Sequence, residues 1–222
     1  MLQQFSGINT AMYYGPEIMR QAGFGSDSHK SATLISSLPL AGVNSIGTMI
    51  SIAFIDSCGR RWIMLRSLPV LALSMIVTGV GMGLRNHTSD DEMLQIIGKW
   101  CAALGLLFYT MSFAIGFCST PWTINAEIYP LHLRGIGNSL ATTTNWVSNF
   151  VVALAFLTLM KHVPYGDIVC FMLFGIICSL AFIFVYVKIP ETKGLKLDDV
   201  ISLFVEDHKK DESLINYHQV EH

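Results

Sequence analysis

The stretch from Ile168 to Val187 reads IVCFMLFGIICSLAFIFVYV and decides the fold class, because it contains no charged residue. A helix needs about 20 apolar residues to cross the ~30 Å hydrocarbon core of a bilayer. Over the whole chain of 222 residues, 52% are hydrophobic and 14% are charged. Soluble domains carry about 25% charged residues to cover their surface. We therefore predict an integral, multi-pass membrane protein.

Five further stretches extend this pattern toward the N-terminus. Four of them lack Asp, Glu, Lys and Arg, whereas the first contains one acid, Glu17, and two neighbouring glutamines. We predict an all-α membrane fold in which residues 1–196 form a six-transmembrane-helix bundle and residues 197–222 form a cytoplasmic tail. The predicted spans are about 1–19, 31–55, 67–84, 100–126, 135–160 and 168–187.

Basic residues favour one side of this predicted bundle. Six spans place both termini on the same side, which has seven Lys and Arg residues against five on the other side. Cytoplasmic loops carry an excess of Lys and Arg, so we expect both termini in the cytoplasm. The membrane could be the plasma membrane or a vacuolar or other organellar membrane. The seven residues are Arg60, Arg61, Arg66, Arg134, Lys188, Lys193 and Lys196.

Amide side chains stand out within the predicted spans, because polar groups are costly in lipid. An amide both donates and accepts hydrogen bonds, which suits a neutral ligand with many hydroxyl groups. Trp122 could add a flat apolar surface and an indole N–H donor. The alternative for each amide is packing between helices. The amides concerned are Gln3, Gln4, Asn9, Asn44, Asn138, Asn145 and Asn149.

Four motifs resemble the sugar porter family of the major facilitator superfamily. Gln3–Asn9 (QQFSGIN) is similar to that family's seventh-helix motif, and Asp56–Arg61 (DSCGRR) is similar to its acidic, Gly-Arg-Arg loop. Pro121–Pro130 (PWTINAEIYP) with Arg134-Gly135 resembles the tenth helix and its exit, and Pro190–Gly194 (PETKG) resembles the C-terminal signature. The third motif, followed by Gly137-Asn138, looks most like the proton/myo-inositol cotransporters.

The resemblance implies the C-terminal half of a twelve-helix major facilitator fold, and the chain opens within a substrate motif. We therefore expect a partial sequence whose partner is a missing N-terminal six-helix half. By motif position, the resemblance also implies seven substrate-binding residues. These are Gln3, Gln4, Asn9, Asn44, Trp122, Asn145 and Asn149.

Gating residues follow from the same resemblance. Tyr13 and Tyr14 would correspond to the outer gate. Five charged residues look like a cytoplasmic ion-pair network that holds one alternating-access state. The alternative is that the basic residues only anchor the helices at the cytoplasmic side of the membrane. They are Asp56, Arg60, Arg61, Glu127 and Arg134.

Two prolines are expected to disturb the predicted spans, because proline lacks a backbone donor. Gly15-Pro16 is expected to loosen the first span, and Pro121-Trp122 is expected to break the fourth. Broken membrane helices are tolerated where they line a cavity. The family often has Gly-Pro or Gly-x-Gly just before Pro-Trp, whereas this chain has Phe117-Cys118-Ser119, which makes flexibility at this break doubtful.

The function implied is transport of a neutral sugar or polyol, myo-inositol or a hexose, by alternating access. Coupling to protons would need an acid in the other half, because no Asp or Glu lies at the centre of a span. The partners expected are the ligand, protons and the lipid bilayer, with no nucleic acid, metal or cofactor. The alternatives are a transporter-like sugar sensor and a non-transporting fragment of a longer carrier. An enzyme is not expected, because no nucleophile–base pair or metal cluster stands in a span.

Overall fold

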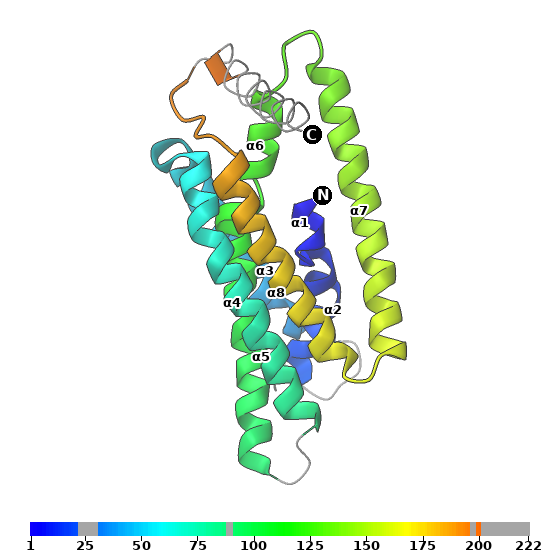
Figure 1. The fold of residues 1–222 in the computed structure, drawn as a ribbon. Coiled ribbons are helices and arrows are strands. Elements are labelled where there is room, and N and C mark those ends of the chain that lie inside the picture. The colour runs from blue at the N-terminus through cyan, green and yellow to red at the C-terminus, as the bar shows by residue number, and fades with distance from the viewer. Residues whose placement is uncertain (22–30, 88–90, 196–198, 201–222) are drawn as a thin grey trace, which may run out of the picture.

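The structure is a computed structural model, and it describes residues 1–21, 31–87, 91–195 and 199–200. Every regular element in this part of the chain is a helix, and together the helices form the elongated bundle of Figure 1. The predicted all-α membrane fold is therefore confirmed. Lys196 and almost all of the predicted tail, residues 197–222, lie outside the described residues.

The chain order of the helices is simple. Helices α1 and α2 form the first predicted span, and α5, the π-helix η1 and α6 form the fourth. The bounds are α1 Leu2–Phe5, α2 Ile8–Gln21, α3 Ser31–Cys58, α4 Arg60–His87, α5 Glu92–Ser112, η1 Phe113–Phe117, α6 Thr120–Glu127, α7 Arg134–His162 and α8 Gly166–Lys188.

The helices extend beyond the charge-free runs that predicted them. Helix α4 has 28 residues and is ~42 Å long, whereas the charge-free run covers only residues 67–84. A charged residue ends the apolar run but not the helix, which continues into the polar headgroup region. Five stretches of the described residues are long and apolar enough to cross a membrane. They are Ser37–Cys58, Arg60–Asn86, Glu92–Glu127, Arg134–His162 and Gly166–Lys188.

The first predicted span is interrupted, but not at Gly15-Pro16. Pro16 lies inside α2, and the helix continues through it. A proline inside a membrane helix is tolerated where neighbouring groups compensate for the missing donor. The chain instead breaks between Phe5 and Ile8, at Ser6 and Gly7.

The core lies between α4, α5 and α8. Leu68, Leu71 and Leu106 are completely buried there. Helices α4 and α5 approach so closely that a Cβ added to Gly81 would lie 2.7 Å from the backbone oxygen of Gly98. Small residues permit such close contact between backbones. Lipid is as apolar as the helix surfaces, so the hydrophobic effect does not drive helices together in a membrane, and close packing stabilises their association instead.

Helices α3 and α7 are much less covered than α4. Only 17% of the α3 span and 22% of the α7 span are buried, against 56% for α4. Figure 1 shows α7 at the edge of the bundle, with the N-terminus of the chain between α7 and α6. The α3–α4 turn, α6, the start of α7 and the end of α8 all lie at one end of the bundle, the upper end in Figure 1. Both α3 and α7 therefore present broad apolar faces outward.

Candidate functional site

A cavity of about 640 Å³ lies between α1, α6, α7 and α8. Its volume is in the range of pockets that bind small molecules. Ile128 and Ile189 line it near the ends of α6 and α8, so the cavity lies toward the upper end of the bundle. Most of the wall is apolar. The side chains with hydrogen-bonding groups are Gln3, Trp122, Asn125 and Asn145.

Two helix faces contribute to the wall of the cavity. Trp122 and Asn125 on α6 are three residues apart, so they share one face, and Ile128 follows directly after the end of the helix. On α7, Ala141 and Asn145 are one turn apart and also share a face. The Trp122 side chain is 39% exposed, whereas Asn145 is 7% exposed. An indole from α6 and an amide from α7 therefore line the same cavity.

The break between α1 and α2 depends on one glycine. Gly7 has φ +87°, and a Cβ there would lie 2.6 Å from the ring of Phe174. The Tyr109 hydroxyl, from α5, donates to the backbone oxygen of Ser6 at 3.0 Å. Tyr109 is completely buried. It thereby satisfies a carbonyl that the interruption leaves without a helical partner.

Gln3 joins this break to the second one. Its Nε2 donates to the backbone oxygens of Phe117 and Cys118, both at 2.8 Å, where η1 ends and before α6 begins. Carbonyls at a helix end need such external donors. Both amide hydrogens of Gln3 are used within the protein, so a ligand hydroxyl can bond only to its Oε1.

Gln4 and Asn9 pair with each other across the first break. Asn9 Nδ2 donates to Gln4 Oε1 at 2.8 Å. Gln4 is buried and Asn9 is half-buried, and neither lines the cavity. This hydrogen bond fixes both amides relative to each other on the two sides of Gly7.

The remaining predicted residues lie away from the cavity wall. Asn44 on α3 and Asn149 on α7 are both half-buried. Of the predicted gate residues, Tyr13 is 63% exposed, whereas the ring of Tyr14 packs on Phe156 with centroids 4.8 Å apart. The cavity thus gathers Gln3, Trp122 and Asn145 from the predicted set and leaves the other four amides outside it.

Three of the predicted charged residues meet at the upper end of the bundle. The Arg60 guanidinium lies 2.9 Å from Asp56 and 3.2 Å from Glu127. The Thr192 hydroxyl also donates to Glu127, at 2.8 Å. This cluster links the end of α3, the start of α4 and the end of α6.

The other two predicted charges bind backbone oxygens instead. Arg61 donates to the carbonyl of Tyr186 at 2.7 Å, and Arg134 donates to the carbonyl of Tyr129 at 3.4 Å. Of the five residues predicted to form one network, three therefore meet as ion pairs and two form hydrogen bonds to backbone oxygens elsewhere.

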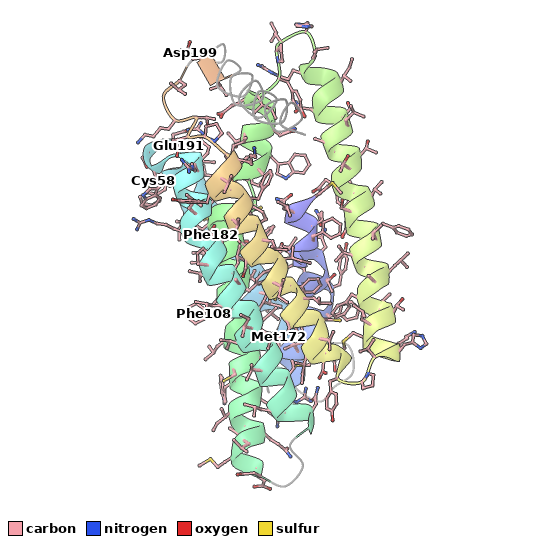
Figure 2. All side chains as sticks on the ribbon, viewed as in Figure 1. Cys58, Phe108, Met172, Phe182, Glu191 and Asp199 are labelled. Atoms are coloured by element: carbon pink, nitrogen blue, oxygen red, sulfur yellow. The ribbon has the colours of Figure 1, made fainter. Side chains whose placement is uncertain are left out.

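Glu191 organises the same end of the bundle. Its carboxylate accepts from the backbone N–H of Arg60 at 2.9 Å and of Trp62 at 3.2 Å. An acid is favourable at a helix N-terminus, where N–H groups lack helical partners. Figure 2 shows Glu191 near Cys58, the last residue of α3. The conformation of the C-terminal motif thus depends on the start of α4.

Comparison with known proteins decides the family. Residues 1–204 match the family described as sugar (and other) transporter. The chain belongs to the sugar transporter family.

Relatives of this chain have different named substrates. It is 32% identical to probable inositol transporter 2 of Arabidopsis thaliana, over 90% of this chain and 46% of the relative. It is also 32% identical to the facilitated trehalose transporter Tret1 of Apis mellifera ligustica, over 96% of this chain and 40% of the relative. The chain therefore spans less than half the length of these relatives.

A solved structure supports the fold of this transporter chain. The proton:xylose symporter XylE of the major facilitator superfamily, bound to 6-bromo-6-deoxy-D-glucose, superposes with a TM-score of 0.74 at 25% identity. The match covers 91% of this chain and 40% of the symporter. The bundle is therefore a six-helix half of the major facilitator fold.

Four residues of this transporter chain were missing from the predicted site. Tyr109 was hidden inside a charge-free run, although its hydroxyl needs a partner when buried. Asn138 is one of the amides in the predicted spans but is not among the substrate-binding residues that the resemblance implies. Asn125 and Glu191 belong to quoted motifs but had been given no role. Their contacts are revealed only by the packing of α5 against the first break, of α6 against α7 and of the C-terminal motif against α4.

Proposed function

We propose that the complete transporter moves a neutral sugar or polyol, myo-inositol or a hexose, across a membrane by alternating access. This chain supplies its C-terminal six-helix half. The observation that supports the proposal most strongly is the cavity wall, which combines amides with an indole. None of the described residues that line it has an ionisable side chain. Such a wall suits hydroxyl groups better than ions.

Four proposed substrate residues lie outside this cavity, namely Gln4, Asn9, Asn44 and Asn149. In alternating access the binding site lies near the midplane, between two repeats that rock against each other. We place these four residues toward the other half, which completes the site. The half-buried positions of Asn9, Asn44 and Asn149 support this assignment.

The other half is also the proposed partner of the exposed faces of α3 and α7. An apolar face inside a bilayer can contact lipid or protein, and the low burial of both helices supports contact with a second bundle. A proton-coupling acid is placed in that half as well, because no Asp or Glu of the described chain lines the cavity.

Orientation and gating follow from the upper end of the bundle. Basic residues of the α3–α4 turn, the start of α7 and the end of α8 lie there, so we place this end in the cytoplasm. The Arg60–Asp56 and Arg60–Glu127 pairs join three helix ends and would have to change on rocking. Asp56 is 82% exposed, so the Arg60–Asp56 pair is worth about 0–1 kcal/mol and can break at small cost. Arg60 and Glu127 are 14% and 20% exposed, so solvent screens their pair less and breaking it costs more.

The test is uptake by the complete transporter reconstituted in liposomes. Saturable uptake of labelled myo-inositol or D-glucose is expected. Asn145→Leu and Trp122→Ala should each raise KM, since each removes a hydrogen-bonding group from the cavity wall. The loss of one hydrogen bond should raise KM about three- to tenfold.

The matched control is Phe108→Leu. Phe108 is 61% exposed on α5, outside the α3 and α7 faces that we assign to the other half, and it does not line the cavity, so uptake should not change. Saturable uptake that Asn145→Leu and Trp122→Ala leave unchanged would contradict the site. Absence of uptake of either substrate by the unmodified protein would contradict the function.

A further inference from the structure

The contact between α6 and α7 at the edge of the cavity contains a pair of asparagines outside the predicted site. Asn125 Nδ2 donates to Asn138 Oδ1 at 2.8 Å, and both side chains are half-buried. Asn125 lines the cavity, whereas Asn138 does not. The pair therefore has an inner member that can reach a ligand and an outer member that holds it.

Helical spacing places Asn125 beside the other polar groups of the wall. It lies one turn after Trp122 on α6 and shares its cavity-facing side. Asn138 lies one turn before Ala141 and two turns before Asn145, on the side of α7 that faces the cavity. The hydrogen bond thus joins the α6 face and the α7 face of the cavity at its edge.

Close packing brings Asn138 within reach of α6. Gly137 is buried, and a Cβ added to it would lie 2.7 Å from the Tyr129 ring. A larger residue would push the start of α7 away from the end of α6. The contact is therefore a consequence of the fold and does not depend only on two flexible side chains.

Hydrogen-bond geometry then fixes which groups Asn125 presents. An amide has two donor hydrogens and an acceptor oxygen with two lone pairs. Asn138 takes one hydrogen and thereby orients the amide plane. Within the described part of the chain, Asn138 is the side chain that bonds to Asn125. The second N–H and Oδ1 of Asn125 can then face the cavity.

We infer that Asn125 is a further substrate-binding residue, selective for a hydroxyl group of a neutral polyol or sugar, and that Asn138 is its positioning residue. This inference rests on the proposed function. One N–H and one oxygen on a fixed amide can donate to and accept from the same hydroxyl or two adjacent ones. A ligand without the matching hydroxyl leaves both groups unpaired, so it binds more weakly.

The test compares KM and Vmax for uptake by the complete transporter. The probes are myo-inositol and D-glucose, each with its single-deoxy analogues. Asn125→Leu should raise KM about three- to tenfold with Vmax within about twofold, because one hydroxyl contact is lost. In the unmodified protein, a deoxy analogue that lacks the contacted hydroxyl should have a higher KM than its parent compound. Asn125→Leu should abolish this difference in KM for one analogue, and the hydroxyl missing from that analogue is the one that Asn125 contacts.

Variants of Asn138 distinguish a positioning role of its acceptor oxygen from an effect of side-chain volume. Asn138→Leu should raise KM, whereas Asn138→Asp keeps an acceptor oxygen and should return KM toward the wild-type value. If Asn125→Leu fails to fold in detergent, Asn125→Ser is measured in its place with the same expectation. The matched control is Thr123→Val, because Thr123 is also half-buried on α6 but does not line the cavity.

Two results would overturn the inference in a protein that transports either probe. One is an unchanged KM and an unchanged deoxy-analogue penalty in the Asn125 variant. The other is an equal increase in KM for Asn138→Asp and Asn138→Leu. Absence of saturable uptake by the unmodified protein is a different result, because it overturns the proposed function before any variant is compared.

Discussion

The two interrupted helices of this chain are broken in different ways. Between α1 and α2 the break is local, because Gly7 adopts φ +87°, which L side chains rarely adopt. Between η1 and α6 no such residue occurs, since Cys118 and Ser119 both keep right-handed helical angles. The second break instead consists of a π-helix followed by carbonyls that bind Gln3 from the first span.

This difference shows that a break can be encoded by one residue or by a distant partner. The glycines that the family often has before Pro-Trp are absent, yet the helix is interrupted at that position. Pro121 then occupies the first turn of α6, where a missing N–H costs nothing. The first break should therefore be sensitive to its own backbone, and the second should be sensitive to side chains of α1.

The largest expected effect is at Gly7. Gly7→Ala places a Cβ in a left-handed conformation and against the Phe174 ring, so we expect a loss of at least about 2 kcal/mol in the free energy of unfolding. The measurement is thermal unfolding of the complete transporter in detergent. The double variant with Phe174→Leu should recover the part of the stability loss that comes from the clash with the ring. The part that comes from the left-handed backbone conformation should remain.

Gly42→Ala is the matched control for that experiment. Gly42 lies inside α3 with open space around its Cα, so alanine should be neutral or slightly stabilising. Equal losses at Gly7 and Gly42 would show that the first break does not depend on the special conformation of Gly7.

The next effect is at Gln3. Gln3→Leu leaves the carbonyls of Phe117 and Cys118 without their side-chain donor, so we expect a loss of about 1–3 kcal/mol in the free energy of unfolding. Gln4→Leu is the control, because Gln4 contacts Asn9 and not η1. It should impair uptake with a smaller change in stability. If Gln4→Leu lowers the unfolding midpoint as much as Gln3→Leu, the second break does not depend on Gln3.

The smallest effect is at Tyr109. Tyr109→Phe removes the donor to the Ser6 carbonyl but keeps the ring in the core, so about 1 kcal/mol of stability should be lost. Tyr186→Phe is the control, since Tyr186 is 61% exposed. An unchanged unfolding midpoint for Tyr109→Phe would show that Gly7 alone maintains the first break.

The predicted site was partly recoverable from residue type. Trp122 and Asn145 stand out in the sequence because amides and an indole are unusual inside a membrane, and both line the cavity. Asn125 does not stand out in this way, because its orientation depends on a hydrogen bond to a residue on the next helix. Arg61 and Arg134 were grouped with the ion pairs by motif alone, and only the distances separate them.

The sequence alone determined the membrane class, the approximate spans and the family motifs. These depend on local properties, namely charge-free length and residue identity, which the order of residues fully contains. Only the tertiary structure decided where the first span breaks and which carbonyls Gln3 binds. It also decided which amides share a cavity. Those outcomes depend on the approach of distant helices, such as Tyr109 to Ser6 and Asn125 to Asn138, and spacing along one helix does not contain that information.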